Sequence, residues 1–254
     1  KRRKDGGMSG LKRFFSENIE VGGECVLSGE EFEHAKTVLR LSVGDEAVLL
    51  SGDGNEYTSI VTAVGKKEIA FHVLSARAGD KEPKTQIALY FGFLKNADKN
   101  EFAVQKAVEL GVSKIGVFSS EYSSAYLSEN KTERLKKVAR EAAKQCMRAS
   151  CPEIAAFSSF EEMLQDAKTY GVRLFACEFA EKSDAPLSEL LKTKETQSGV
   201  AAIVGSEGGF SAREAEEARA KGCKFVSLGK RILRAETAAV ALTSVIAYET
   251  GEWQ

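Results

Sequence analysis

Two glycine-containing loops near the end of the chain carry the residue types best suited to chemistry. The first glycine loop is residues 205–209 (GSEGG), and the second glycine loop is residues 228–238, which contain Arg234 and Glu236. Glycines let backbone N–H groups approach a ligand closely, and an array of such donors can hold an anion. The glycine spacing matches neither G-x-G-x-x-G nor the P-loop, so a cradle for nucleotide phosphates is disfavoured.

Each loop also has an ordinary structural interpretation. The first glycine loop leads to Ser211, with Glu214 three residues later, and this pair predicts a capping box at a helix start. Arg234 and Glu236 can form a surface ion pair beside the next helix. However, two glycine-containing loops at the ends of two strands can build one pocket, and ligands of open α/β sheets bind at such strand ends.

The elements that must position these loops follow an alternating pattern. Apolar runs of strand length lie at Ile87–Phe91, Ile115–Phe118, Val172–Cys177, Val200–Val204 and Phe225–Leu228. Helical patterns lie at Asn100–Leu110, Glu129–Ser150, Phe160–Thr169, Ala212–Lys221 and Ala235–Glu249. The alternation predicts an α/β domain with a parallel sheet that helices cover on both faces, over residues 86–254.

The N-terminal part differs, because short strands and turns dominate it. The expected strands are Val21–Leu27, Glu46–Leu50, Glu56–Val64 and Glu68–Leu74, with a helix over Gly29–Leu41. This pattern predicts a small β-barrel over residues 11–75. Residues 75–85, polar and with one proline, are the expected linker. Residues 1–10 begin with KRRKDGG, and we interpret them as a leader or tag remnant.

Composition excludes several classes of protein. The 254 residues carry 36 basic and 37 acidic side chains, so the net charge of -1 excludes a generally basic coat for nucleic acid. Residues 95–150 nevertheless hold an excess of basic over acidic side chains. No apolar run approaches the ~20 residues that span a bilayer.

The five cysteines do not predict a metal centre. None lies in a C-x-x-C pair, and His34 and His72 are the two histidines of the chain. Because a structural zinc site needs four such ligands at close spacing, we expect no bound metal and interpret the cysteines as reduced thiols.

The two glycine loops closely resemble the cofactor-loop signatures of the RsmE family, bacterial 16S ribosomal RNA uridine-N3 methyltransferases of the SPOUT class. Residues 203–211 and 228–238 carry this resemblance, which extends over residues 11–250. Further similar segments are Phe14-Phe15, His34 to Arg40, residues 52–57, Gln105 to Val112, and Glu141, Gln145, Arg148 and Pro152. Two residues differ from the family pattern: Ser206 stands where proline is usual, and Tyr122 where arginine is usual.

The resemblance implies a fold and a function. It implies a PUA-like RNA-binding β-barrel, then a SPOUT methyltransferase domain whose C-terminal end forms a trefoil knot. It also implies a cytoplasmic homodimer that uses S-adenosylmethionine to methylate N3 of uridine 1498 in 16S ribosomal RNA of the 30S subunit. The residues expected to bind the cofactor are Val204, Gly205, Glu207, Gly208, Gly209, Leu228, Gly229, Ile232, Leu233 and Ala238.

Methylation of uridine N3 requires removal of the proton that N3 carries at neutral pH. Both histidines precede residue 75, so the proton acceptor in the C-terminal domain must be another group. Glu207 and Glu236 are the candidates, and Arg234 can stabilise charge on a uracil oxygen. The choice between the two carboxylates stays open here, as does a structural role for Glu236.

Basic side chains suggest where RNA binds. His34 and Arg40 match the family in the N-terminal domain, and the basic segment adds Arg134, Arg140, Lys144 and Arg148. Each of these residues can also be an ordinary solvated or structural side chain. Two other functions remain open: a SPOUT methyltransferase with another RNA target, and a non-catalytic ribosome-associated RNA-binding protein.

Overall fold

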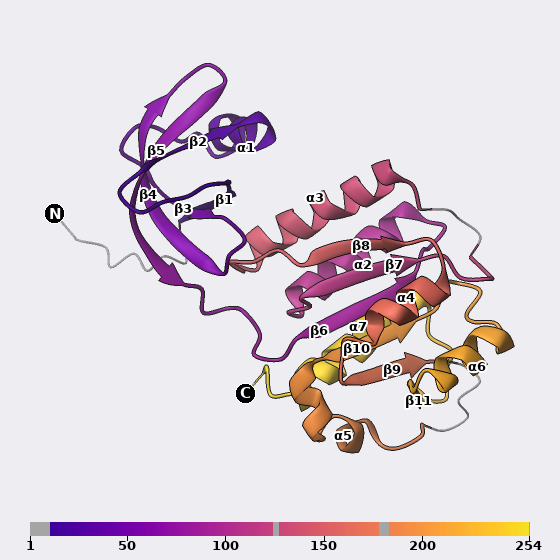
Figure 1. Ribbon diagram of the computed structural model, residues 1–254. Coiled ribbons are helices and arrows are strands. Elements are labelled where there is room, and N and C mark those ends of the chain that lie inside the picture. Colours follow the sequence, from indigo (N-terminus) through magenta and orange to yellow (C-terminus); the bar gives the residue numbers. More distant parts are fainter. Residues whose placement is uncertain (1–10, 124–126, 178–182, 254) are drawn as a thin grey trace. The chain divides into compact units, whose positions relative to one another are not determined.

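The computed structural model describes residues 11–123, 127–177 and 183–253, which form two compact units (Figure 1). The N-terminal unit extends to Glu82 and also includes Ala143–Cys151. The C-terminal unit comprises Pro83–Ala142 and the residues from Pro152 onward. The short segment Ala143–Cys151 therefore belongs to the N-terminal unit, although it is distant in the chain from the rest of that unit.

The C-terminal unit contains the parallel sheet that the alternating pattern predicts. Its strands are β6 (Ile87–Gly92), β7 (Lys114–Phe118), β8 (Glu153–Phe157), β9 (Val172–Ala176), β10 (Val200–Val204) and β11 (Lys224–Val226). Their order is β11-β9-β10-β6-β7-β8, and every neighbouring pair is parallel. The sequence pattern does not predict β8, because its sequence, EIAAF, is alanine-rich and only partly buried and lacks the apolar run of a central strand.

Helices cover both faces of this sheet. They are α2 (Ala97–Glu109), α3 (Glu129–Gln145), α4 (Phe160–Ala167), α5 (Leu187–Leu190), α6 (Ala212–Ala220) and α7 (Ala235–Glu249), with the 3₁₀ helix η3 (Lys194–Ser198). Tyr90 and Ile203 share a core cluster with residues of α4 and α6. Their neighbours Leu89 and Ala202 point to the opposite face by strand alternation, where α7 packs on β6 and β10. Burial on both faces explains the unbroken apolar runs.

Helix α3 is shorter than the expected segment 129–150. It ends at Gln145, and Met147 has a φ of 64°, in the left-handed region that an α-helix cannot include. The residues that follow are held by Glu82. Its carboxylate accepts hydrogen bonds from the backbone N–H groups of Ala149 and Ser150, both at 2.9 Å, and from Arg148 Nη2 at 2.9 Å. This carboxylate fixes residues 148–150 within the N-terminal unit.

The N-terminal unit is built on a five-stranded, barrel-like sheet. Its strands are β1 (Lys12–Phe15), β2 (Glu24–Ser28), β3 (Glu46–Leu50), β4 (Asn55–Val64) and β5 (Glu68–Ala78), in the order β1-β3-β4-β5-β2. Strand β1 pairs in parallel with β3, and the sequence does not predict it because its four residues are too few for a period-2 pattern. The expected helix over residues 29–41 is α1 (Gly29–Glu33) followed by a π-helix, η2 (His34–Val38). The trefoil knot stays a prediction.

Candidate functional site

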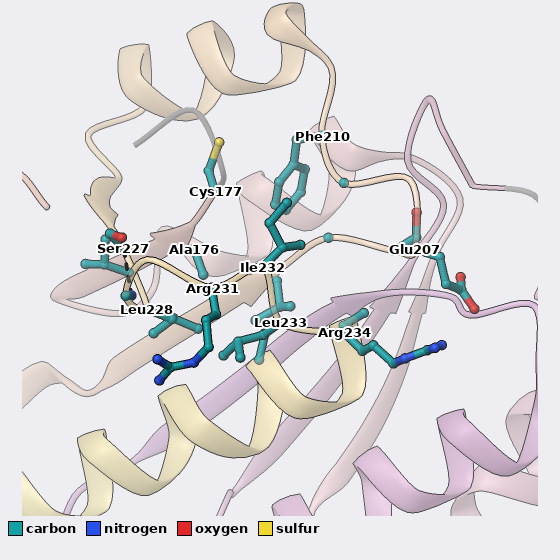
Figure 2. A pocket seen from close by; sticks show the side chains of 18 of the residues that line it. Ala176, Cys177, Glu207, Phe210, Ser227, Leu228, Arg231, Ile232, Leu233 and Arg234 are labelled. Atoms are coloured by element: carbon teal, nitrogen blue, oxygen red, sulfur yellow. Dashed lines mark hydrogen bonds between the residues drawn. The ribbon is translucent and has the colours of Figure 1, made fainter. Parts of the chain in front are cut away.

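A cavity of about 530 Å³ lies at the carboxyl ends of β9, β10 and β11 (Figure 2). Because these strands are parallel neighbours, the loops that follow them meet at one edge of the sheet. Both glycine loops contribute to the wall, together with one residue of α2. The lining residues are Lys99, Ala176, Cys177, Val204, Gly205, Ser206, Glu207, Gly209, Phe210, Val226, Ser227, Leu228, Gly229, Lys230, Arg231, Ile232, Leu233, Arg234, Ala235 and Ala238.

The first glycine loop is held tightly against the sheet. The N–H of Gly209 donates to the carbonyl oxygen of Ser206 at 3.0 Å. At Gly92, the end of β6, a Cβ would lie 2.5 Å from the backbone nitrogen of Ser206, so only glycine permits this approach. Phe210 is 2 % exposed, and its ring centroid lies 4.2 Å from that of Phe175. The capping box of Ser211 and Glu214 is confirmed, and α6 begins as expected.

The second glycine loop presents apolar side chains and open backbone. Gly229 has a φ of +104°, and a Cβ built there meets no atom within 4 Å. Ile232 is 88 % exposed, whereas Leu228 and Leu233 are half-buried. Figure 2 shows these three side chains along the stretch that leads to α7. The loop therefore offers an apolar surface and accessible peptide groups to a ligand.

The structure brings Glu207 and Arg234 together on one cavity. Figure 2 shows their side chains extending on the same side of it. Both side chains are exposed, and Arg234 is the N-cap residue of α7 without using its side chain for capping. The Glu207 carboxylate accepts the backbone N–H of Lys95 at 3.1 Å and 3.3 Å. One hydrogen bond leaves further acceptor positions on Glu207 for a substrate.

Glu236 lies elsewhere and has a different partner. It is absent from the cavity lining of the described residues, and its side chain is 14 % exposed. Its Oε1 lies 3.2 Å from the Nζ of Lys99, so the ion pair expected with Arg234 is replaced by one with Lys99. The sequence could not indicate Lys99, because only the contact between α2 and α7 brings it to the second glycine loop.

Nine of the ten expected cofactor residues line the cavity, and Gly208 does not. A Cβ at Gly208 would lie 2.7 Å from the Cβ of Tyr122 and 2.9 Å from its carbonyl oxygen. The glycine at this position therefore makes room for the turn that carries Tyr122. This close contact is visible only in the fold.

The basic residues expected to bind RNA fall into two groups. Arg40, Arg134 and Arg140 are exposed, although Arg134 also pairs with Glu101. The other group, Lys144, Arg148 and His34, contacts other side chains of the protein. In this group, the Nζ of Lys144 donates to Glu31 at 3.0 Å.

The side chains of Arg148 and His34 contact other residues of the N-terminal unit. Arg148 is 3 % exposed, and its guanidinium binds Glu82, so it is not displayed to a phosphate in this structure. The half-buried His34 ring lies edge-on to the ring of the core residue Phe14, with the centroids 6.4 Å apart.

The described residues show neither a metal-binding cluster nor a helix that could span a membrane. They contain no group of three or more histidine, cysteine, aspartate or glutamate side chains that could hold a metal ion. Among the described helices, none is long and apolar enough to cross a membrane.

Known protein families match the sequence of both units. A family described as "RNA methyltransferase domain" matches residues 80–247, and one described as "RNA methyltransferase PUA domain" matches residues 27–74. The chain is 29 % identical to ribosomal RNA small subunit methyltransferase E of Bacillus subtilis, over 94 % of this chain and 97 % of the relative. It is 32 % identical to the protein of that name from Rickettsia conorii, over 84 % of each chain.

Solved structures show the same similarity. Ribosomal RNA small subunit methyltransferase E of Neisseria gonorrhoeae, bound to S-adenosylmethionine, matches with a TM-score of 0.84 and 26 % identity. The match covers 96 % of this chain and 100 % of that one. A structure from Legionella pneumophila with bound S-adenosylmethionine matches with a TM-score of 0.83 and 28 % identity, over 94 % and 97 % of the two chains.

Proposed function

Because the chain belongs to the RsmE family of small-subunit ribosomal RNA methyltransferases, we propose that it methylates 16S ribosomal RNA from S-adenosylmethionine, at N3 of uridine 1498. The observation that carries this proposal is the single cavity that both glycine loops build, with Glu207 and Arg234 on one side of it. An acid–base group and a cation beside a ligand cavity are what removal of the N3 proton requires.

The cavity suits S-adenosylmethionine. Its volume of about 530 Å³ lies within the range of small-molecule sites. The open backbone at Gly229 can accept polar groups of the ligand, and Leu228 and Leu233 offer a surface for the adenine ring. When bound, the cofactor supplies a methyl group activated by a sulfonium. The remaining tasks, which are alignment of the uracil and removal of its proton, belong to the residues of this chain.

We assign the proton acceptor to Glu207. Of the two carboxylates that the sequence left open, Glu207 lines the cavity, whereas Glu236 is largely buried and binds Lys99. The guanidinium of Arg234 donates to a uracil oxygen, which gains negative charge as the N3 proton leaves. Exposed Arg40, Arg134 and Arg140 contact the phosphates of the RNA.

We also propose a cytoplasmic homodimer whose substrate is 16S ribosomal RNA or the 30S subunit. The support for the dimer is the family and the composition of α7. Helix α7 buries Ala239, Leu242 and Ile246, yet Tyr248 is 55 % exposed and nearby Trp253 is 56 % exposed. A second copy can cover such a surface. A monomeric mass by light scattering at micromolar concentration would contradict the dimer.

One experiment tests the reaction and its target. Small-subunit RNA is incubated with the protein and labelled S-adenosylmethionine, and the methylated nucleotide is then mapped. We expect label at N3 of uridine 1498. Label at another nucleotide, or in transfer RNA only, supports the alternative SPOUT specificity. The absence of label, together with no heat of S-adenosylmethionine binding in calorimetry, would support a non-catalytic RNA-binding protein.

A further inference from the structure

Lys99 contributes a positive charge to the wall of the cavity, and no sequence motif predicts this contribution. It lies in the first turn of α2, lines the cavity, and its side chain is 26 % exposed. Its Nζ lies 3.2 Å from the Oε1 of Glu236, which lies in the first turn of α7. Two helix starts therefore meet at this ion pair.

The ion pair differs from an ordinary pair on the protein surface. Glu236 has a side-chain exposure of 14 %, and its Oε2 is buried without a hydrogen-bond partner among the described residues. A carboxylate so placed attracts the Lys99 ammonium, which carries three N–H donors. Glu236 thereby fixes where the ammonium stands, and further donors of Lys99 are available to a ligand in the cavity.

The charges around the cavity form a pattern. Arg234 is the N-cap of α7, two residues before Glu236, so a second cation stands beside the same helix start. Among the described lining residues, Glu207 is the one acidic side chain. The lining holds four cationic side chains: Lys99, Lys230, Arg231 and Arg234. Of these, Lys99 and Arg234 stand at the start of α7, and we consider them together with the acceptor Glu207.

This pattern matches one edge of uracil. Uracil presents the N3–H donor between two carbonyl oxygens, O2 and O4, and loss of the N3 proton spreads negative charge onto both. We propose that Lys99 donates to one of these oxygens while Arg234 donates to the other, and that Glu236 positions Lys99. In the step concerned, the N3–H bond breaks, the proton moves to Glu207, and the electron pair stays on the ring. Cytosine has no N3 proton and an amino group at position 4, so the same pattern excludes it.

The proposal rests on the proposed function, and its test begins with Lys99→Ala. We expect single-turnover methylation at pH 7 to fall about 10²-fold, as for loss of one preorganised donor. S-adenosylmethionine affinity by calorimetry should stay within the range of a matched control, Lys106→Ala. Lys106 lies on the same helix and pairs with Glu109 on its surface. The melting temperature of Lys99→Ala should fall, because the largely buried Glu236 carboxylate loses its partner, and it should recover when Glu236→Gln is added. The rate deficit of Lys99→Ala should shrink as pH rises, because hydroxide then removes the N3 proton.

A substrate change tests the same contact independently. Synthetic RNA with 5-fluorouridine at the target has a more acidic N3–H, since fluorine withdraws electrons from the ring. Lys99→Ala should recover a larger fraction of wild-type rate on this RNA. In equilibrium binding without cofactor at pH 8.5, the wild type should prefer the fluorinated RNA, and Lys99→Ala should lose that preference.

Glu236→Gln tests the positioning role. We expect a smaller loss of rate than for Lys99→Ala, and no additional loss when both substitutions are combined. Two results would overturn the proposal: a rate deficit of Lys99→Ala that is equal at every pH, or a fall in its cofactor affinity as large as its fall in rate. If the wild type itself does not methylate N3 in the mapping experiment, the proposed function fails, and that result is distinct from either of these.

Discussion

The hydroxyl oxygens of Ser120 and Ser206 lie 3.4 Å apart, so a side-chain contact joins the turn after β7 to the first glycine loop. The turn is itself fixed, because the Ser123 hydroxyl accepts the N–H of Ser120 at 2.9 Å. Ser206 is 6 % exposed and stands where the family usually has proline. We expect these hydroxyl contacts to restrict the loop, as a proline ring at position 206 would.

Removal of this contact should weaken cofactor binding. Ser120→Ala leaves the Ser206 hydroxyl without this partner, and a typical hydrogen bond contributes about 1 kcal/mol, or roughly five-fold in affinity. We expect calorimetry to show a loss of that order for S-adenosylmethionine. Ser206→Pro in the Ser120→Ala background should restore the affinity by stiffening the loop through the backbone. Failure of the proline to restore it would contradict a role in loop stiffness.

Arg234→Ala should reduce turnover while leaving the site assembled. Loss of a donor to charge that develops in the transition state costs about 10²–10³ in turnover. Because the Arg234 side chain makes no capping hydrogen bond, the melting temperature and cofactor affinity should change little. Arg234→Lys should not rescue fully, since lysine lacks the planar pair of donors. Single-turnover rates, calorimetry and thermal unfolding of Arg234→Ala test this role. Wild-type turnover would contradict it, as would a parallel loss of turnover, cofactor affinity and melting temperature.

Glu207 combines two roles that substitution can separate. In Glu207→Gln the amide oxygen can still accept the N–H of Lys95, whereas the proton-accepting charge is lost. We expect about 10²–10⁴-fold slower methylation at neutral pH, with recovery as pH rises. Glu207→Ala should additionally lower cofactor affinity, because the loop loses its link to Lys95. Full activity of Glu207→Gln at neutral pH would assign Glu207 to loop structure alone.

Local patterns predicted the framework of the site but not its pairing of charges. Unbroken apolar runs such as Val200–Val204 indicated buried parallel strands, and Ser211 with Glu214 indicated the start of α6. Both features depend on neighbouring residues only. The ion pair of Lys99 with Glu236 depends on two helices that are distant in sequence, and no periodicity records that contact.

Arg148 is a second residue whose partner the sequence could not reveal. Its position in a basic segment made it a candidate for phosphate contact, because sequence reports charge and not burial. In the fold its guanidinium is satisfied by Glu82, which is distant in sequence. The partner of a buried charge is set by tertiary structure, so charge density alone overestimates the RNA-binding surface.

Glu82 gives the last prediction, which concerns stability and pH. Burial of Glu82 opposes its ionisation, but hydrogen bonds from Arg148 and Ser150 outweigh that effect and hold the carboxyl pKa below its usual 4.5. A carboxyl group with a lowered pKa stabilises the folded state fully above that usual value. The contribution is lost as pH falls through the folded-state pKa.

Glu82→Gln should therefore destabilise the protein at pH 7 and much less in acid. Arg148 is 3 % exposed, and removal of its charged partner leaves the guanidinium buried and uncompensated, at a cost of about 3 kcal/mol. We expect urea unfolding to show this difference at pH 7, and the two proteins to converge as pH falls below 4.5. Hydrogen exchange at the amides of Ala149 and Ser150 should accelerate in the variant, because both donate to Glu82. Glu46→Gln, at an exposed position of β3, is the control; a stability difference independent of pH would show that Glu82 acts through shape and not charge.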